Sequence, residues 1–356
     1  MVSIKDVAKL SGVSVMTVSR VVNGSDNVRE ETRDKVNQAI QELDYIPNQL
    51  AKSLVNSSTR TVGVLFSNIF NPVYLSIISG IEKRAHERGY NIIISNATDY
   101  KSSVEGLNML VSKMIDGLIV LPVEFNNMND EQASADAVDE MWRFYGALKR
   151  MLARRKLPCV VIDIDIKSDL ADYVCHDYIG TAKMGIEYLI GLGFKRIHHI
   201  NSELREGLWA DRQKAYETGM KAAGLEKEIR VDYCANSTAA AFRLVRKLLQ
   251  TNEKPEAFYC ANDILAIGAM QAINACGLHI PDDIAVMGND GIYIGEMLIP
   301  SLATVDICSS ELGEKAMDGC HNYIEGNRAS EKIYIRPSSE RKIRSGYGAR
   351  QGDIKS

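Results

Sequence analysis

Arg20 is the first residue whose type and position indicate a chemistry. It lies in the stretch 14–23, SVMTVSRVVN, which has two faces at helical spacing. One face is apolar, with Val18, Val21 and Val22; the other carries Val15, Met16, Ser19 and Arg20. A guanidinium on such an outer face can pair with guanine O6 and N7, worth about 1–3 kcal/mol of base discrimination. The alternatives are a phosphate contact or a surface helix of no special purpose.

A second set of polar side chains ends the apolar, strand-like runs of the later chain. Asp163 lies in CVVIDI (159–164), Asn262 and Asp263 end AFYCAND (257–263), and Asp290 ends IAVMGND (284–290). Open α/β sheets bind ligands at the carboxyl ends of their strands. Carboxylates and amides collected there would bind the hydroxyls of a polyol such as a sugar. The simpler readings are a helix cap for Asn262 and a solvated loop carboxylate for Asp163.

Patterns typical of metal sites and catalysis are missing from the sequence. His198 and His199 are neighbours in a strand-like run and would face opposite ways. His176 and Asp177 stand beside no placed nucleophile, and no glycine-rich phosphate loop follows a strand; GYGARQG (346–352) reads as tail. We therefore predict no catalytic residues, no metal, no cofactor and no enzymatic activity.

The elements that position Arg20 are short helices. Ser3 followed by Asp6 resembles a capping box, Gly12 can end that helix with a positive φ, and Ser14 can cap the next helix. Residues 28–43, VREETRDKVNQAIQEL, predict a third helix with acids in its first turn. After Pro47, residues 49–56 predict a helix too short to be stable alone in water. It should form only when packed against something.

Four segments, SIKDVAKLSGVS, TVSRVVNG, VREETRDKV and YIPNQLAKSL, resemble in order and spacing the DNA-binding head and hinge of the LacI/GalR family of bacterial transcription regulators. The likeness is unbroken over the first sixty residues and looser from there nearly to the C-terminus. It implies that Arg20, Val15 and Met16 read bases. It further implies that Leu54 is a wedge entering the minor groove at the centre of a palindromic operator. Other DNA contacts implied in this way are Ser3, Ser14, Thr17, Ser19, Asn23, Tyr45, Asn48 and Ala51.

From residue 61 onward, apolar runs alternate with amphipathic stretches. The predicted strands are 61–67, 91–96, 116–122, 159–164, 196–200, 257–262, 284–290 and 333–337. Nearly continuous apolar strands separated by helices indicate parallel sheets covered on both faces. The fold expected is an all-α helix-turn-helix head with a hinge helix, and an α/β core of two doubly wound parallel-sheet subdomains. By the resemblance, that core is like a type I periplasmic binding protein.

The expected domains are the head at 1–46, the hinge helix and linker at 47–60, and an effector-binding and dimerisation core at 61–350. The resemblance divides the core into an N-subdomain (about 61–163 and 291–325) and a C-subdomain (about 164–290 and 326–350), with three crossings. Residues 124–150 are longer than the family's usual segment. Their apolar spacing predicts an extended surface helix, with a lid or partner surface as the alternative.

The resemblance also supplies an effector site. It makes Arg212, in ADRQKAY (210–216), the effector-binding arginine, and it lets Tyr74 stack on the ligand from the other lobe. Asn289 stands where the family often has an aromatic residue, a loss for which Trp209 could compensate. The complete expected set is Tyr74, Asp163, Trp209, Arg212, Asn262, Asp263 and Asp290.

Composition sets broad limits on function. The 356-residue chain has a formal charge of −4, and its first sixty residues carry eight basic and seven acidic side chains. Placed contacts, rather than bulk attraction to phosphate, must then position DNA. We expect no signal peptide and no membrane span, because the first residues lead directly into a polar helix and no apolar run is long enough. Its seven cysteines, without a C-x-x-C pair, indicate reduced thiols and a cytoplasmic, nucleoid-associated protein.

The predicted function is that of a homodimeric repressor of carbohydrate-utilisation genes. Its partners would be a pseudo-palindromic double-stranded operator and a small effector, a sugar or sugar phosphate. Alternatives are a global regulator co-repressed by a phosphorylated carrier protein, and a repressor that senses a nucleobase. A solute-binding protein would need export and an α/β enzyme would need a placed nucleophile or cofactor loop, neither of which the sequence provides.

Overall fold

The computed structural model describes residues 2–22, 24, 27–45, 58–123, 135–205, 207–251, 254–328, 333–335 and 343–344. The chain divides into two compact units, Met1–Thr59 and Arg60–Ser356. Among the described helices, none combines the length and apolarity that crossing a bilayer requires.

The N-terminal unit contains three helices, α1 (Ile4–Ser11), α2 (Val15–Val22) and α3 (Glu30–Glu42). Ser3 and Asp6 form the predicted capping box, and Gly12 ends α1 at φ +68°, where a side chain would be strained. The Ser14 hydroxyl accepts a hydrogen bond from the Thr17 amide at 3.1 Å and so caps α2. Val7, Val18, Val21 and Val36 are buried in the centre of the bundle. The predicted helix-turn-helix head is therefore confirmed.

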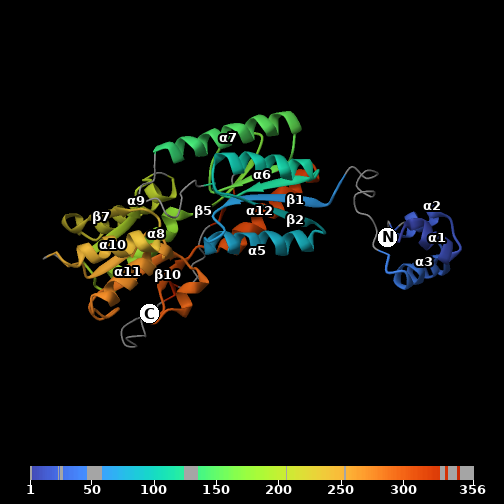
Figure 1. The fold of residues 1–356 in the computed structure, drawn as a ribbon. Helices are drawn as coiled ribbons and strands as arrows, with labels where there is room; N and C mark the ends of the chain where they lie inside the picture. The colour runs from blue at the N-terminus through green and yellow to red at the C-terminus, as the bar shows by residue number, and fades with distance from the viewer. Residues whose placement is uncertain are drawn as a thin grey trace. The chain divides into compact units, whose positions relative to one another are not determined.

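The N-subdomain is a six-stranded parallel sheet in the order β11-β5-β4-β3-β1-β2. Its strands are β1 (Thr61–Ser67), β2 (Asn91–Ala97), β3 (Gly117–Val120), β4 (Cys159–Ile162), β5 (Asp172–His176) and β11 (Ile333–Ile335). One face packs on α5 (Pro72–Glu87) and α12 (Ser309–Ile324). The other packs on α6 (Tyr100–Ser112) and α7 (Ala135–Arg155), as Figure 1 shows.

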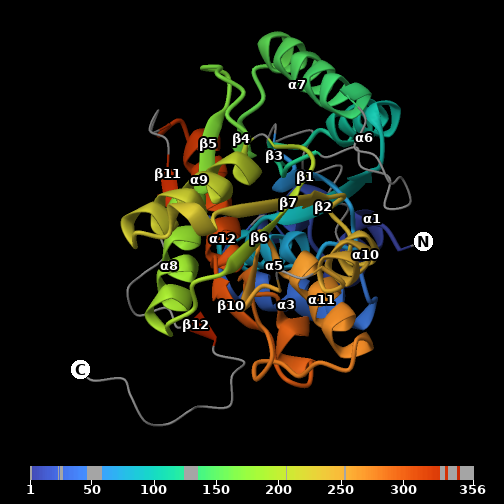
Figure 2. The same cartoon turned by 90° about the vertical axis from the view of Figure 1, so that its left-hand side faces the viewer.

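The C-subdomain has the strand order β12-β10-β9-β8-β6-β7, parallel except for β12. Its strands are β6 (Ile197–Ser202), β7 (Arg230–Cys234), β8 (Ala257–Cys260), β9 (Ala285–Asp290), β10 (Ala303–Asp306) and β12 (Ile343–Arg344). Helices α8 (Tyr178–Gly191) and α9 (Leu208–Ala222) cover one face, and α10 (Thr238–Leu248) and α11 (Asp263–Ala275) the other (Figures 1 and 2). Two short 3-10 turns, Glu226–Glu228 and Tyr293–Met297, complete it. The predicted pair of doubly wound subdomains is confirmed.

The chain crosses between the subdomains after β5, after β10 and between β11 and β12. These positions differ from the predicted boundaries at residues 163, 290 and 325. Strand β5 pairs with β4 and stays in the N-subdomain, β10 pairs with β9 and stays in the C-subdomain, and β11 returns to β5. Each exception extends a sheet by pairing with a strand edge that would otherwise be open, because an unpaired edge leaves backbone groups unsatisfied.

The extended segment forms the long helix α7 with one buried face. Phe144, Tyr145, Leu148 and Leu152 are at most 1 % exposed and pack in the N-subdomain core. Trp142, whose ring centroid lies 6.1 Å from that of Tyr145, is 48 % exposed at the edge of this face. The helix thus packs as the preferred interpretation of residues 124–150 predicts; residues 124–134 lie outside the described part of the chain.

Candidate functional site

The outer face of α2 is the first candidate site. Val15 and Met16 are 41 % and 66 % exposed, and Arg20 is exposed beside them, whereas Val18 and Val21 on the opposite face are buried. Burying Val15 and Met16 would have been favourable, so their exposure leaves apolar surface available to a partner. Apolar ends suit thymine methyl groups, and Arg20 suits guanine. The three predicted base-reading residues therefore share one solvent-facing surface.

The other predicted DNA contacts are placed unevenly. Ser3 and Ser14 are exposed at the starts of α1 and α2, and both hydroxyls are engaged in caps. Thr17, Ser19 and Tyr45 are partly buried, and Tyr45 packs against the bundle core. Their role in contacting phosphates stays a prediction. Asn23, Asn48, Ala51 and Leu54 lie outside the described residues.

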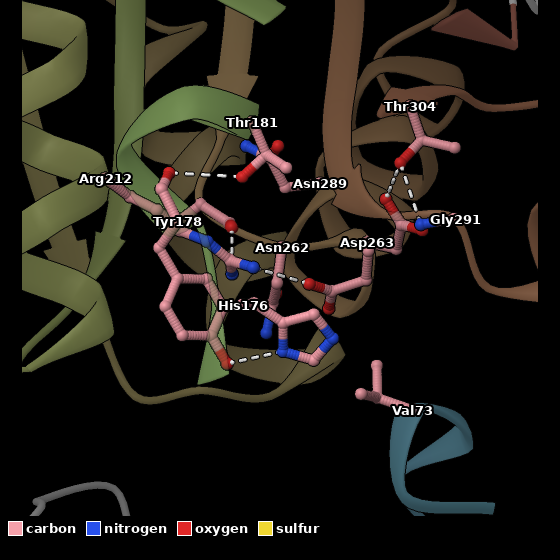
Figure 3. Close-up of polar contacts among 12 residues, drawn as sticks. Val73, His176, Tyr178, Thr181, Arg212, Asn262, Asp263, Asn289, Gly291 and Thr304 are labelled. Carbon is pink, nitrogen blue, oxygen red and sulfur yellow. Dashed lines mark hydrogen bonds and ion pairs between the residues drawn. The ribbon is translucent and has the colours of Figure 1, made fainter. Parts of the chain in front are cut away.

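The second candidate site is built on Arg212, in the second turn of α9. Its guanidinium is 2 % exposed, donates to Asp290 Oδ1 at 2.7 Å and also donates to the backbone carbonyl of Ala261 (Figure 3). Burial opposes the charge, but the Asp290 carboxylate outweighs it and raises the arginine pKa. The Arg212 Nε is buried with no hydrogen-bond partner among the described residues. The guanidinium is therefore bound through two of its three nitrogens, and the third, Nε, has no partner among the described residues.

Asp263, the first residue of α11, lies behind this pair. It is fully buried, and its two oxygens accept hydrogen bonds from the Thr304 hydroxyl at 2.6 Å and the Ile292 amide at 2.8 Å. Burial, followed by the nearby Asp290 charge, raises the Asp263 pKa to about 7. Burial also raises the pKa of Asp290, against the opposing effect of Arg212. Asp263 thus holds the loop that follows β9 and does not point freely toward a ligand.

Asn262 has the capping role that its position suggests. Its Oδ1 accepts from the Leu265 amide at 2.9 Å, and its Nδ2 donates to Asn236 Oδ1 at 2.9 Å. Asn289 is buried and donates to the Tyr259 hydroxyl. Two amide side chains therefore line the strand ends beside the Arg212–Asp290 pair, one of them fixed by the N-terminus of α11.

Asp163 brings the N-subdomain into the same site. It follows β4 at φ +57°, and its carboxylate accepts from the His176 amide at 2.9 Å, while Oδ2 accepts from the Tyr178 hydroxyl at 2.7 Å. Burial alone would raise its pKa, but the electrostatic interaction with His176 and these hydrogen bonds outweigh burial and lower it. The Tyr178 ring in turn lies 4.9 Å from the Arg212 guanidinium carbon. We call Asp163, His176, Tyr178, Arg212 and Asp290 the polar site; Figure 3 labels His176, Tyr178 and Arg212.

Two predicted ligand contacts lie elsewhere. Tyr74 is 6 % exposed and belongs to the apolar core beneath α5, and Trp209 is 4 % exposed within the core of the C-subdomain. Both aromatic rings are needed to fill their cores, which explains why neither is free to stack on a ligand. Val73, next to Tyr74, is partly buried and is the α5 side chain labelled in Figure 3.

Sequence reasoning missed His176, Tyr178 and Thr304 as members of this arrangement. His176 and Tyr178 flank the end of β5, a strand whose mixed polar sequence DYVCH hid it. Had β5 been recognised, its carboxyl end would have drawn attention to both residues. The described residues contain no group of three or more His, Cys, Asp or Glu side chains arranged to hold a metal ion.

Comparisons with known proteins find a matching family model for each of the two units. Residues 3–48 match the model for bacterial regulatory proteins of the lacI family, and residues 186–344 match a periplasmic binding protein-like domain. The ribose operon repressor of Escherichia coli (strain K12) is 33 % identical, covering 95 % of this chain and 98 % of that protein. The HTH-type transcriptional repressor PurR of Histophilus somni (strain 129Pt) is 30 % identical, covering 95 % and 97 %. A crystal structure of the lac repressor bound to ONPG superposes with a TM-score of 0.77 at 26 % identity, covering 96 % of this chain and 99 % of that one.

Proposed function

Since this chain belongs to the lacI family of bacterial regulatory proteins, we propose that it is a transcriptional repressor whose affinity for operator DNA is controlled by a polyol of the sugar class at the polar site. It acts as a homodimer on the nucleoid in the cytoplasm and catalyses no reaction. The observation that carries the proposal is the buried Arg212–Asp290 pair, with its unused Nε donor, in a chain whose N-terminal unit exposes Val15, Met16 and Arg20 together.

The charges of the polar site favour a neutral effector over a sugar phosphate or another anion. Arg212 already neutralises Asp290, and Asp163 adds a carboxylate whose pKa is lowered. An anionic ligand would therefore meet two carboxylates for one guanidinium. Carboxylate and guanidinium groups suit hydroxyls, whereas Tyr74 and Trp209 lie in the cores and cannot stack on a flat nucleobase. Similarity to the ribose operon repressor supports a sugar.

Exposed apolar side chains support the homodimer. Ile299, Met297 and Tyr293 are 93 %, 71 % and 55 % exposed on one segment of the C-subdomain, and Phe70 is 75 % exposed in the N-subdomain. Several large exposed apolar side chains on one segment are typical of a surface that another chain covers. Two heads held by a dimer would then read the two half-sites of a pseudo-palindrome.

Communication between the two sites would pass through residues 47–60. The sequence predicts a helix there that is marginal alone, so it forms only while two copies pack against each other. A ligand that favours one arrangement of the subdomains would favour or disfavour that pairing. The effect on DNA affinity then equals the difference in ligand affinity between the two states.

The test is fluorescence anisotropy of labelled DNA from upstream of the protein's own gene, with and without candidate effectors. The panel contains D-ribose, D-xylose, D-glucose and D-galactose, with ribose 5-phosphate and hypoxanthine as the competing classes. We expect site-specific binding whose affinity one neutral sugar changes by about 5–150-fold. A response to ribose 5-phosphate or hypoxanthine alone would reject the polyol, and failure to bind the upstream DNA specifically would reject the repressor.

A further inference from the structure

His176 is the last residue of β5 and stands where the chain first crosses between the subdomains. Its side chain is 1 % exposed, and its Nδ1 lies 3.0 Å from Asp163 Oδ2 and 3.2 Å from the Tyr178 hydroxyl. Its backbone amide donates to the other Asp163 oxygen. The ring is thus fixed on one edge by two side chains and by its own backbone.

These contacts determine which ring nitrogen carries the proton. The Tyr178 hydroxyl donates its hydrogen bond to Asp163 Oδ2, at 2.7 Å. Asp163 is held as a carboxylate, because its pKa is lowered, and can only accept. His176 Nδ1 must therefore be the donor to Asp163. In the neutral imidazole the opposite nitrogen, Nε2, is then a hydrogen-bond acceptor.

The acceptor Nε2 is buried and has no hydrogen-bond partner in the described part of the chain. Leaving a buried polar atom without a hydrogen bond is unfavourable, so a partner is expected at this position. Figure 3 shows the Nδ1 edge of the ring turned to Tyr178 and the opposite edge turned away from it. The unpartnered donor Arg212 Nε belongs to the guanidinium on the Tyr178 ring. One unused acceptor and one unused donor thus flank the same tyrosine.

We propose that His176 Nε2 accepts a hydrogen bond from one hydroxyl of the effector and so determines which hydroxyl pattern the protein recognises. This inference rests on the proposed function and deepens it. An analogue without that hydroxyl leaves the buried Nε2 unpartnered again and binds more weakly.

The experiment measures binding of D-ribose, D-xylose, D-glucose and D-galactose, and of each single deoxy analogue of the sugar that binds, by isothermal titration calorimetry. It compares the full-length wild type with two matched variants. The His176→Asn side chain can supply an N–H in place of Nδ1 to Asp163 but reaches no atom at Nε2. The His176→Gln side chain places a polar atom near Nε2. We expect His176→Asn to weaken sugar binding about 10-fold, the value of one hydrogen bond, and His176→Gln about 3-fold or less.

The deoxy analogues provide a readout that a purely structural role would not change. One analogue should bind the wild type about 10-fold more weakly than the parent sugar does, because its missing hydroxyl is the partner of Nε2. His176→Asn should bind that analogue and the parent sugar equally well. Additive losses for every analogue, or wild-type affinity in His176→Asn, would overturn the inference. If His176→Asn lowers the melting temperature, the wild-type His176 side-chain ¹⁵N resonances decide: sugar must shift the Nε2 signal, and an unchanged signal overturns the inference.

Failure of the proposed function looks different. If no sugar binds the wild type although it binds its upstream DNA, the polyol proposal fails, and the inference about His176 fails with it. If a sugar binds the wild type, and Arg212→Met abolishes that binding while His176→Asn does not weaken it, only the inference fails.

Discussion

Replacing Arg212 by Met would leave the Asp290 carboxylate buried without its cation. The two groups are 2.7 Å apart, and their side chains are 2 % and 9 % exposed. Water can therefore replace little of the stabilisation that the guanidinium gives the Asp290 carboxylate. Breaking a buried ion pair by removing one partner costs about 3–5 kcal/mol, mostly as the penalty for the charge that remains. Met fills a volume similar to that of the arginine stem, so little destabilisation should come from an empty cavity.

Two further variants, Asp290→Asn and the double variant, separate the contribution of the ion pair from that of side-chain packing. Asp290→Asn alone leaves the guanidinium buried and should cost a similar amount. The double variant buries neither charge, so its loss should be clearly smaller than the two single losses together. We expect a coupling free energy of at least about 2 kcal/mol in the double-mutant cycle. Because burial raises the Asp290 pKa, protonation should also shrink the loss in Arg212→Met at pH 5 relative to pH 8.

The assay is urea denaturation followed by tryptophan fluorescence. The chain has two tryptophans, of which Trp142 is 48 % exposed on α7 and Trp209 is 4 % exposed in the C-subdomain core. In a Trp142→Phe background the remaining signal therefore reports the subdomain that contains Arg212 and Asp290. A coupling free energy below about 0.5 kcal/mol would refute the reasoning, since an exposed pair commonly gives no more.

Three further predictions concern other parts of the molecule. Arg20→Lys should lower operator affinity by about 1–3 kcal/mol and relax selectivity at one base pair, because Lys cannot form the bidentate pair; competition against single-base operator variants measures this. Gly313→Ala should unfold or severely destabilise the core, since its Cβ would lie 2.0 Å from the Ile77 carbonyl oxygen, whereas Gly319→Ala on the same helix meets nothing closer than 3.6 Å; thermal melts compare the two. The wild type should lose more unfolding free energy than Asp263→Asn between pH 5 and pH 8. The Asp263 pKa is about 7 when folded and 3.8 ordinarily, so the folded state binds the proton more tightly and is weakened as pH rises, by a few kcal/mol at most.

Each prediction has a contrary result. Equal loss of affinity for every operator variant would make Arg20 a phosphate contact. Equal melting temperatures for the two alanine variants would mean that α5 and α12 adjust without cost. A parallel pH dependence in wild type and Asp263→Asn would show that Asp263 is ionised throughout this range.

The head was predictable because its signals are local. Ser3, Gly12 and Ser14 each set one helix end through hydrogen bonds or a backbone angle within four residues. The apolar strands were predictable for a similar reason, since a strand buried on both faces must be apolar throughout, as β4 and β8 are.

The polar site was predictable only in part. Arg212, Asp290 and Asp163 follow from strand ends and from the family resemblance, and the structure brings them together through Tyr178. His176 was not predicted, because β5 carries no clear apolar pattern and its carboxyl end was therefore not recognised. The subdomain boundaries failed for the same reason: the pairing of β5, β10 and β11 depends on which sheet edge is open.

The stacking roles predicted for Tyr74 and Trp209 show that a sequence does not determine which way an aromatic side chain points. An aromatic residue near a site in sequence can fill the core or face the ligand, and one residue of helical rotation separates the two outcomes. In α5 that rotation buries Tyr74 and leaves its neighbour Val73 only partly buried against the same core.

The central claim is that a ligand held by Arg212 and Asp290 controls the affinity of the head for DNA. The most direct test is the operator dissociation constant, measured by anisotropy with and without saturating sugar, for the wild type and for Asp290→Asn. Sugar should change the wild-type constant by at least about 5-fold, and Asp290→Asn should bind the same operator without responding to sugar. An equal response in both proteins would contradict the account.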